Sequence, residues 1–314
     1  MSNDLLQRIQ TLQFSDRAAA QTLLLEFVRA MFPLDVRAVE LRPLAVSLNS
    51  FNGFLTLADG SRLFFKTHTE PDGVIGEYYH AGRLADAGYP VLQPLYSSTE
   101  AGKQLLIYEV IDDPSVFDVA WEVENGRADL LPLLTRAQND VDDHLLETYR
   151  ATLEWQLADD AARAPVHQLF YHRLAGERLE RFYNPGVTVK LPDGRASLGE
   201  VRQVRWRING RDYHLTLDDL IRTASDLLTP AQAGPSIIGH GDAHNGNLFF
   251  RHRGQLASLL YFDPAFAGRH HPLLDLTKPL FHNVFAMWMY FPEVQRDATR
   301  VALQRDPGRW TVEH

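Results

Sequence analysis

The sequence predicts an α+β protein with a β-rich N-terminal part and a mainly helical C-terminal part. Alternating apolar residues, interrupted by turn residues, dominate the chain from about residue 38 to residue 111. Beyond Asp112-Asp113-Pro114, apolar residues recur at helical spacing. The length of 314 residues is also enough for roughly two domains.

The N-terminal part opens with an amphipathic helix over residues 15–32, which Ser15-Asp16 would cap. We expect strands at 39–46, 51–57, 62–66, 91–96 and 104–111. Asn52-Gly53 and Asp59-Gly60 are predicted hairpin turns. A helix over 73–87 would end before Gly88, and Pro90 would block its continuation. The result is a unit of one antiparallel sheet of five strands and one helix.

The helical part contains a β insertion at about 187–217, with strands expected at 187–191, 204–208 and 212–217. One interpretation is a lid over an acceptor pocket, with Arg205 and Arg207 facing an anionic group. The other is a hairpin packed by Trp206 with a solvated basic face, which we favour. A short helix at 218–228 then precedes an apolar strand at 237–238.

Composition excludes several classes of protein. The chain has no cysteine, so it has no disulfide, thiolate zinc site or cysteine nucleophile. Its formal net charge of −9 argues against duplex nucleic acid as the main partner. The N-terminus lacks the pattern of a signal peptide, and the longest apolar run is far shorter than a membrane span. We therefore expect a cytoplasmic protein without a membrane or nucleic-acid partner.

The most informative segment is 238–250, where Asp242 and Asn247 lie five residues apart on a turn between strands. Phosphoryl transfer needs a carboxylate to orient and deprotonate a hydroxyl, and oxygen ligands for Mg²⁺. Asp263 follows the next apolar strand, 256–262. A hairpin turn at 251–254 would return Asp263 close to Asn247.

The run from His240-Gly241-Asp242 to Asn247, followed by Asp263, resembles the H-G-D-x-x-x-x-N loop and metal-binding Asp of aminoglycoside phosphotransferase-like enzymes. These small-molecule kinases are relatives of protein kinases, and the resemblance covers roughly residues 46–276. It implies a two-lobed protein-kinase-like fold, with an N-lobe at 1–111 that binds nucleotide and a C-lobe at 112–314 that binds the acceptor. It also implies that Asp242 is the catalytic base and that Asn247 and Asp263 bind the metal.

The resemblance extends to the N-lobe. It implies that Lys66 reaches the α- and β-phosphates, that Glu77 pairs with Lys66, and that the backbone of 105–111, including Glu109 and Ile111, binds adenine. The phosphate loop, 46–54, departs from the family pattern because it contains a single glycine. Its small polar residues could still present N–H groups to phosphate; they include Ser47, Asn49 and Ser50.

The sequence thus predicts an enzyme that transfers the γ-phosphoryl group of ATP, or of GTP as the alternative, with Mg²⁺. The expected acceptor is a hydroxyl of a small molecule such as an aminoglycoside, an amino alcohol or a sugar-like metabolite. A nucleotide-binding pseudokinase and a protein kinase are the alternatives. His240 is expected to be structural, Asp275 is implied to be structural, and His270-His271 is expected to be a solvated turn.

Overall fold

The computed structural model describes residues 3–42, 50–68, 73–98, 100, 102–294 and 299–314. The chain forms two compact units: residues 1–152 with 238–268, and residues 153–237 with 269–314. Both contain helices and sheets, which confirms the predicted α+β class. The 238–268 segment joins the N-terminal residues in the first unit. A functional boundary between lobes near residue 111 stays a prediction.

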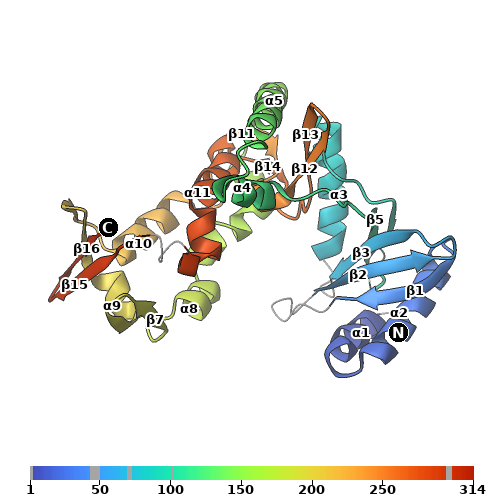
Figure 1. The fold of residues 1–314 in the computed structure, drawn as a ribbon, viewed down its shortest axis with the longest axis horizontal. Coiled ribbons are helices and arrows are strands. Elements are labelled where there is room, and N and C mark those ends of the chain that lie inside the picture. Colours follow the sequence, from blue (N-terminus) through green and yellow to red (C-terminus); the bar gives the residue numbers. More distant parts are fainter. Residues whose placement is uncertain (1–2, 43–49, 69–72, 99, 101, 295–298) are drawn as a thin grey trace. The chain divides into compact units, whose positions relative to one another are not determined.

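A five-stranded antiparallel sheet of order β1-β2-β3-β5-β4 dominates the start of the first unit. Its strands are β1 (Val36–Leu41), β2 (Ser50–Leu57), β3 (Arg62–His68), β4 (Tyr96–Ser98) and β5 (Leu105–Glu109). Helices α1 (Asn3–Ser15) and α2 (Arg17–Met31) lie on one side of this sheet (Figure 1). Their apolar stripes, which include the buried Leu24, pack on Phe51 and Phe65 of the sheet. Burial of this stripe is what stabilises α2 in the predicted place.

The predicted turn at Asn52-Gly53 is wrong, because both residues lie inside β2. Gly53 is opposite Leu41 on one side and Phe65 on the other. A Cβ atom on Gly53 would be only 1.9 Å from the Glu40 carbonyl oxygen. This glycine therefore permits a close approach of two strands rather than a turn. The turn at Asp59-Gly60 is confirmed, with φ +87° at Gly60 and a Ser61 N–H bond of 2.8 Å to Asp59 Oδ1.

The predicted strand at 91–96 is also wrong over most of its length. After α3 (Gly73–Asp86), the segment at 90–92 pairs with Tyr261 instead of joining the sheet. Leu92 N–H donates to the Tyr261 carbonyl and Tyr261 N–H donates to the Pro90 carbonyl, each at 2.8 Å. Only Tyr96–Ser98 forms a strand of the sheet. Proline at 90 and 94 leaves this stretch without the N–H groups that a continuous ladder needs.

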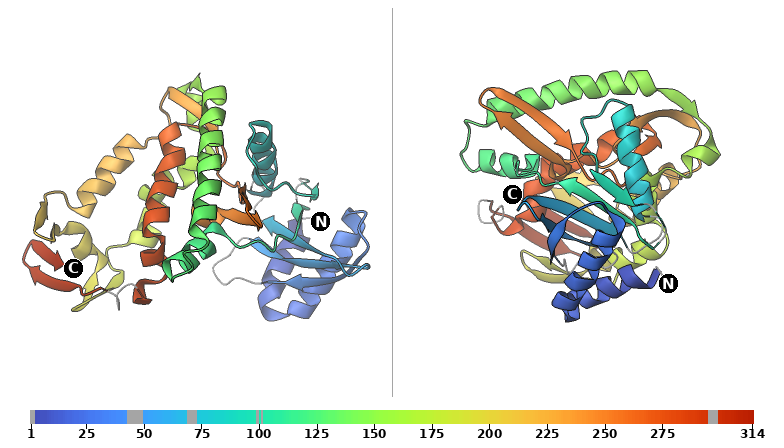
Figure 2. Two further views of the ribbon diagram at one scale, coloured as in Figure 1. Left: turned by 45° about the horizontal axis from the view of Figure 1, so that its top comes forward. Right: turned by 90° about the vertical axis from the view of Figure 1, so that its right-hand side faces the viewer.

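The rest of the first unit surrounds the hairpin of β12 (Leu248–Arg253) and β13 (Leu256–Tyr261). Helices α4 (Val116–Glu124) and α5 (Leu131–Thr152) cover it, and α5 runs along β13 (Figure 2). Val119, Phe250 and Tyr261 are among the buried residues of this second core.

The second unit contains a three-stranded sheet of order β14-β11-β6 and several short helices. Its elements are β6 (Glu154–Gln156), α6 (Ala158–Ala161), η1 (Pro165–Gln168), α7 (Tyr171–Leu174), α8 (Glu177–Tyr183), α9 (Leu198–Gln203), α10 (Leu217–Leu227), β11 (Gly234–Gly239), β14 (Gly268–His270) and α11 (Pro272–Tyr290). The short helix η2 (Asn245–Asn247), between β11 and β12, belongs to the first unit. No helix in the described part of the chain combines the length and apolar character needed to cross a bilayer.

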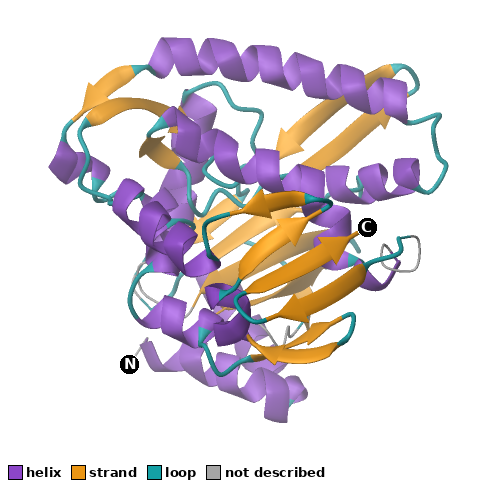
Figure 3. Cartoon of the chain, turned by 90° about the vertical axis from the view of Figure 1, so that its left-hand side faces the viewer, coloured by secondary structure: helices purple, strands orange, loops and turns teal. Residues whose placement is uncertain are grey.

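The β insertion forms more than the predicted hairpin. After β7 (Thr188–Leu191) and β8 (Gly194–Ser197), strands β9 (Arg205–Ile208) and β10 (Arg211–Tyr213) join β15 (Ala302–Asp306) and β16 (Arg309–Glu313) in a sheet of order β10-β9-β16-β15 (Figure 3). Trp206 packs edge-on against Trp310 at 5.4 Å, while the Arg205 side chain is exposed. The contact of Trp206 agrees with a packed hairpin and Arg205 with a solvated basic face, whereas Arg207 is partly buried and lies 3.9 Å from Asp212. Spacing within 187–217 could not predict its C-terminal partner strand.

Candidate active site

The predicted catalytic loop follows β11 directly and is anchored by His240, which is fully buried. His240 Nε2 lies 3.0 Å from the Phe262 carbonyl oxygen, and Nδ1 accepts the Asp242 N–H at 3.3 Å. The carbonyl can only accept, so the proton is on Nε2. The His240 ring thus links the start of the loop to Phe262 by hydrogen bonds, which is the structural role expected for it.

Gly241 gives the loop its sharp bend. Its φ is +77°, a conformation that L side chains rarely adopt, and a Cβ atom would lie 2.6 Å from the Phe266 carbonyl oxygen. The glycine of the H-G-D motif is therefore required both by backbone conformation and by close approach to the following segment.

Asp242 and Asn247 lie together behind this bend, with 7% and 9% of their surfaces exposed. Asn247 Nδ2 donates to the Asp242 carbonyl at 2.9 Å, and its backbone N–H donates to the His244 carbonyl at 2.7 Å. Because the amide nitrogen is held by the loop, the Asn247 amide oxygen points the opposite way. His244 Nε2 lies 3.6 Å from Asp242 Oδ1. The loop thus holds the Asp242 backbone through the Asn247 amide and places the His244 ring beside the Asp242 carboxylate.

The β12–β13 hairpin returns the chain to this loop, as its turn signal predicted. Phe262 N–H donates to the Asn247 carbonyl at 3.0 Å, and the rings of Phe249 and Phe262 stack at 4.2 Å. Asp263 is the next residue and has φ +55°, which is rare outside glycine. The hydrogen bond of Phe262 ties the end of the hairpin to Asn247, and the backbone turns at the next residue, Asp263.

Lys66 on β3 reaches Asp263 from 197 positions away in the sequence. Its Nζ atom lies 2.8 Å from Asp263 Oδ1, with 21% of the lysine side chain and 42% of the aspartate side chain exposed. The partial exposure of the carboxylate leaves it accessible to a further ligand. The structure thus brings together an ammonium group, a carboxylate and the loop that carries Asp242 and Asn247.

The other N-lobe predictions fall partly beyond what the structure describes. Ser47 and Asn49 lie outside the described residues. Ser50 begins β2 and Glu77 lies in α3, but their side chains are outside the described part. Glu109 ends β5 opposite Leu63, and Ile111 follows in the linker to α4. Their proposed contacts with nucleotide stay predictions.

The structure adds a charged cluster that sequence reasoning missed. Arg251 Nε lies 3.1 Å from Asp113 Oδ2, and Arg251 Nη2 lies 3.6 Å from Glu109 Oε1. Arg253 approaches the same Asp113 carboxylate at 3.8 Å. We call these four side chains the linker clamp, because they join the segment after β5 to β12. Arg251 and Asp113 are 138 positions apart in the sequence, so local spacing could not have shown this contact.

The expectation of a solvated turn at His270-His271 is wrong for His270. Its side chain is 1% exposed and Nε2 lies 3.2 Å from Oδ1 of the buried Asp275. His271 is exposed and caps α11 by accepting the Leu273 N–H on Nδ1. Asp275 therefore has a structural contact within the second unit, consistent with the role that the resemblance implied.

The donor atoms at the loop are suited to a hard cation. The Asn247 amide oxygen and the Asp263 carboxylate are oxygen ligands, and Mg²⁺ commonly takes one or two protein carboxylates together with water and phosphate oxygens. Over the described residues, no group of three or more His, Asp or Glu side chains forms a self-contained metal site. The residues present thus fit a magnesium ion whose remaining ligands come from a nucleotide and water.

No protein-family model and no curated protein matches the sequence. Among solved structures, the chain is similar to a spectinomycin phosphotransferase, APH(9)-Ia, in complex with ADP and spectinomycin, with 14% identity over 82% of this chain and 72% of that chain and a TM-score of 0.43. An amicoumacin kinase in complex with AMP-PNP and Ca²⁺ has 16% identity over 85% and 70%, with a TM-score of 0.47. An ethanolamine kinase of Plasmodium vivax has 10% identity over 91% and 74%, with a TM-score of 0.46. The solved structures that the chain resembles here are thus small-molecule phosphotransferases and kinases.

Proposed function

We propose that this protein is a phosphotransferase that moves the γ-phosphoryl group of ATP, or of GTP as the alternative nucleotide, to a hydroxyl of a small molecule. The observation that carries the proposal is the 2.8 Å pair of Lys66 and Asp263 beside the loop of Asp242 and Asn247. An ammonium group, two carboxylates and an amide oxygen are the groups that phosphoryl transfer requires, in one place.

Asp242 would orient the acceptor hydroxyl and take its proton as the new P–O bond forms. The bond between the γ-phosphorus and the bridging oxygen breaks, and ADP leaves with that electron pair. The backbone on both sides of Asp242 is held, through its N–H by His240 and through its carbonyl by Asn247. Such fixed orientation is the main contribution that a protein makes to this reaction.

Asn247 and Asp263 would hold Mg²⁺, which when bound neutralises charge on the nucleotide phosphates. Lys66 would bind the α- and β-phosphates and be oriented by Glu77. Its contact with Asp263 keeps the ammonium group at the site. The adenine would bind to the backbone of the β5 strand and linker, including Glu109 and Ile111, and the phosphates to N–H groups of the segment that contains Ser47, Asn49 and Ser50.

The test is magnesium-dependent ADP release from ATP with a panel of aminoglycosides, amino alcohols, sugars and a generic protein substrate. Wild type is compared with Asp242→Asn and with Asp143→Asn, which removes the same charge from an exposed position on α5. We expect acceptor-stimulated release by wild type and by Asp143→Asn, and a loss of at least about 10²-fold in Asp242→Asn.

Two outcomes would overturn the proposal. Full transfer by Asp242→Asn would show that another group is the base. Nucleotide binding by wild type without transfer to any acceptor would reduce the function to that of a nucleotide-binding pseudokinase.

A further inference from the structure

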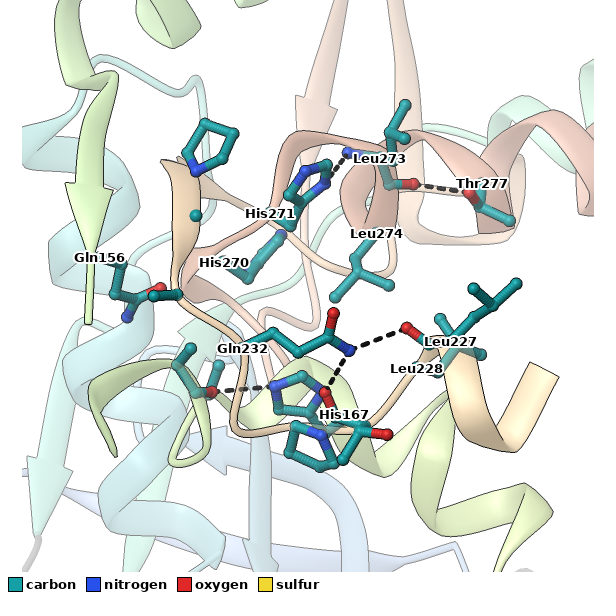
Figure 4. Close-up of a pocket in the computed structure, with 17 residues that line it drawn as sticks. Gln156, His167, Leu227, Leu228, Gln232, His270, His271, Leu273, Leu274 and Thr277 are labelled. Atoms are coloured by element: carbon teal, nitrogen blue, oxygen red, sulfur yellow. Dashed lines mark hydrogen bonds between the residues drawn. The ribbon is translucent and has the colours of Figure 1, made fainter. Parts of the chain in front are cut away.

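The second unit contains a cavity of about 440 Å³ that includes none of the residues proposed for phosphoryl transfer. Its walls come from β6, α6, η1, the end of α10 with the segment that leads into β11, the end of β14 and the start of α11 (Figure 4). This volume lies in the range of small-molecule sites in proteins, roughly 300–1,000 Å³. The cavity is therefore large enough for a ligand of its own.

The chemistry of the walls excludes a charged ligand. Of the described residues that line the cavity, none is Asp, Glu, Lys or Arg. Leucine, proline and alanine side chains, such as Leu228, Pro230 and Leu274, provide most of the surface. A charged molecule would lose its hydration here without gaining a counter-charge, whereas an apolar molecule would be favoured.

Two buried histidines in the wall have hydrogen-bonding capacity that the protein does not use. His167 Nε2 lies 2.9 Å from the Ala161 carbonyl, and His270 Nε2 lies 3.2 Å from Asp275 Oδ1. Both partners accept, so each ring carries its proton on Nε2 and leaves Nδ1 as an acceptor. Neither Nδ1 has a hydrogen-bond partner within the described chain. Buried polar atoms are normally satisfied, so this unused capacity calls for a donor from outside the protein.

Gln232 adds an acceptor of fixed direction. Its Nε2 atom donates to the Leu227 carbonyl at 2.9 Å and to the Thr229 carbonyl at 2.7 Å, at the end of α10. Its amide oxygen is consequently turned away from α10, toward the side of the cavity where Leu274 lies (Figure 4). The wall thus offers three acceptor atoms, Nδ1 of His167, Nδ1 of His270 and the amide oxygen of Gln232.

We propose that this cavity binds a neutral small molecule that has an apolar body and donates at least one hydrogen bond, as a hydroxyl or N–H group does. The cavity shares no residue with the phosphoryl-transfer site proposed above. Its ligand is recognised by apolar contact with the leucines and prolines and by donation to acceptors of the wall, Gln232 first.

The test uses three probes of similar size: 4-propylphenol, which donates a hydrogen bond; 4-propylanisole, which cannot; and 4-propylbenzoate, which is charged. Binding is followed by NMR titration of the histidine ring resonances and by calorimetry. We expect the phenol to bind at one site about ten-fold more tightly than the anisole, a difference of one hydrogen bond. The benzoate should be the weakest.

Variants of lining residues test whether the probes bind in the cavity. Gln232→Leu, which removes the acceptor at nearly constant volume, should abolish the preference for phenol over anisole. Thr277→Trp puts bulk into the cavity from an exposed position of α11 and should abolish binding of both. Leu280→Trp is the matched control, because Leu280 is exposed on the same helix and does not line the cavity.

Tightest binding by the benzoate, equal binding of phenol and anisole, or unchanged binding by Thr277→Trp would overturn the proposal, as would failure of all three probes to bind. Asp242→Asn should bind the phenol as wild type does, because the two sites share no residue. If Asp242→Asn loses phosphoryl transfer but still binds the phenol, the two proposals are tested separately. Failure of one would then not be mistaken for failure of the other.

Discussion

Single residues determine whether the loop at 240–247, the proposed catalytic loop, can form. His240 brackets the loop by its ring, Gly241 bends it at φ +77°, and Asn247 closes it through the Asp242 carbonyl. The first and third contacts need the particular side chains of His240 and Asn247, and the bend needs the absence of a side chain at Gly241. None of the three depends on hydrophobic burial alone. The loop is therefore sensitive to conservative changes that a surface turn would tolerate.

Gly241→Ala isolates this effect. We expect it to lower the free energy of unfolding by about 2–3 kcal/mol, because the new Cβ meets the Phe266 carbonyl as well as an unfavourable φ. Gly254→Ala is the control: its φ is +59°, but no atom lies within 4 Å of the place that the new methyl group would take. It should cost about 1 kcal/mol. Urea denaturation of both variants measures the difference, and equal losses would contradict the steric argument.

The Lys66–Asp263 pair leads to a second residue-scale prediction. Lys66→Met should lower kcat/KM for ATP by about 10²-fold, because the proposed phosphate contact disappears. Lys103→Met removes a partly exposed lysine that pairs with Glu100 near β5 and should leave kcat/KM unchanged. The measurement is kcat/KM for ATP of wild type and both variants, with the acceptor that stimulates ADP release in the panel described above. A similar loss in both variants would show a general effect of charge.

At the scale of elements, the first unit depends on close contacts between strands and on the linker clamp. Gly53 lets β1 and β2 approach at Glu40, and Arg251 ties the linker after β5 to β12. The hydrogen bond from Phe250 N–H to the Pro114 carbonyl, at 2.8 Å, reinforces the same junction. These contacts hold the proposed adenine-binding strand next to the hairpin that positions Asp263.

Asp113→Asn should weaken the linker clamp. We expect KM for ATP to rise about 3–10-fold with little change in kcat, because the linker loses its orientation while Asp242 is untouched. The clamp is partly exposed, so its contribution to stability should be only about 1 kcal/mol. Asp112→Asn, at the exposed neighbouring position, is the matched control and should behave as wild type. An increase of KM in both variants would rule out a specific clamp.

Two glycines in the first unit should respond in opposite directions to alanine. Gly53→Ala has no room for its methyl group at 1.9 Å from the Glu40 oxygen and should destabilise the sheet by several kcal/mol, on the order of a buried overpacking change. Gly82→Ala lies in helix α3 with open space and should stabilise by about 0.5–1 kcal/mol. The measurement is the Tm of both variants and of wild type by thermal denaturation. A lower Tm in Gly82→Ala than in wild type would contradict this account.

At the scale of the whole molecule, the two units have separate hydrophobic cores. Phe51, Phe65 and Phe250 lie in cores of the first unit, whereas Trp206 and Trp310 pack in the core of the second. Units with separate cores can unfold separately. Every tryptophan of the chain except Trp121 belongs to the second unit. Tryptophan fluorescence therefore reports mainly on that unit.

Acid should destabilise the second unit. Burial lowers the pKa of His167, helped by His172 and His270, and burial lowers the pKa of His282, helped by Lys278. Below the ordinary value of about 6.5, the unfolded chain binds protons that the folded unit does not. Stability is therefore complete above this value and falls as the pH drops through the range below it.

Denaturant unfolding at about pH 7.5 and about pH 5.5, followed by tryptophan fluorescence, measures this effect. His282→Gln should reduce the pH dependence. A second unit that is equally stable at both pH values would contradict the prediction.

Local patterns accounted for a large share of the fold. The stripe of apolar residues predicted α2, the Asp59-Gly60 turn predicted the β2–β3 hairpin, and the turn before Leu256 predicted that Asp263 returns to Asn247. These features depend on residues close in the sequence, where side-chain periodicity and turn conformation are decisive. Asn52-Gly53 gave a wrong turn prediction because Gly53 is needed for the close contact of β2 with Glu40 of β1. That contact involves another strand and is not visible in the local sequence.

By itself, the sequence determined the α+β class and the order of the elements in the N-terminal sheet region, and it supplied the residues that we propose for phosphoryl transfer. The tertiary structure alone decided that Lys66 meets Asp263, that Arg251 faces Asp113, and that β9 pairs with β16. It also decided that His167 and His270 share the wall of one cavity. The physical reason is the same in each case. These partners are far apart along the chain, and their meeting depends on how packed elements bury their apolar faces, which local spacing does not encode.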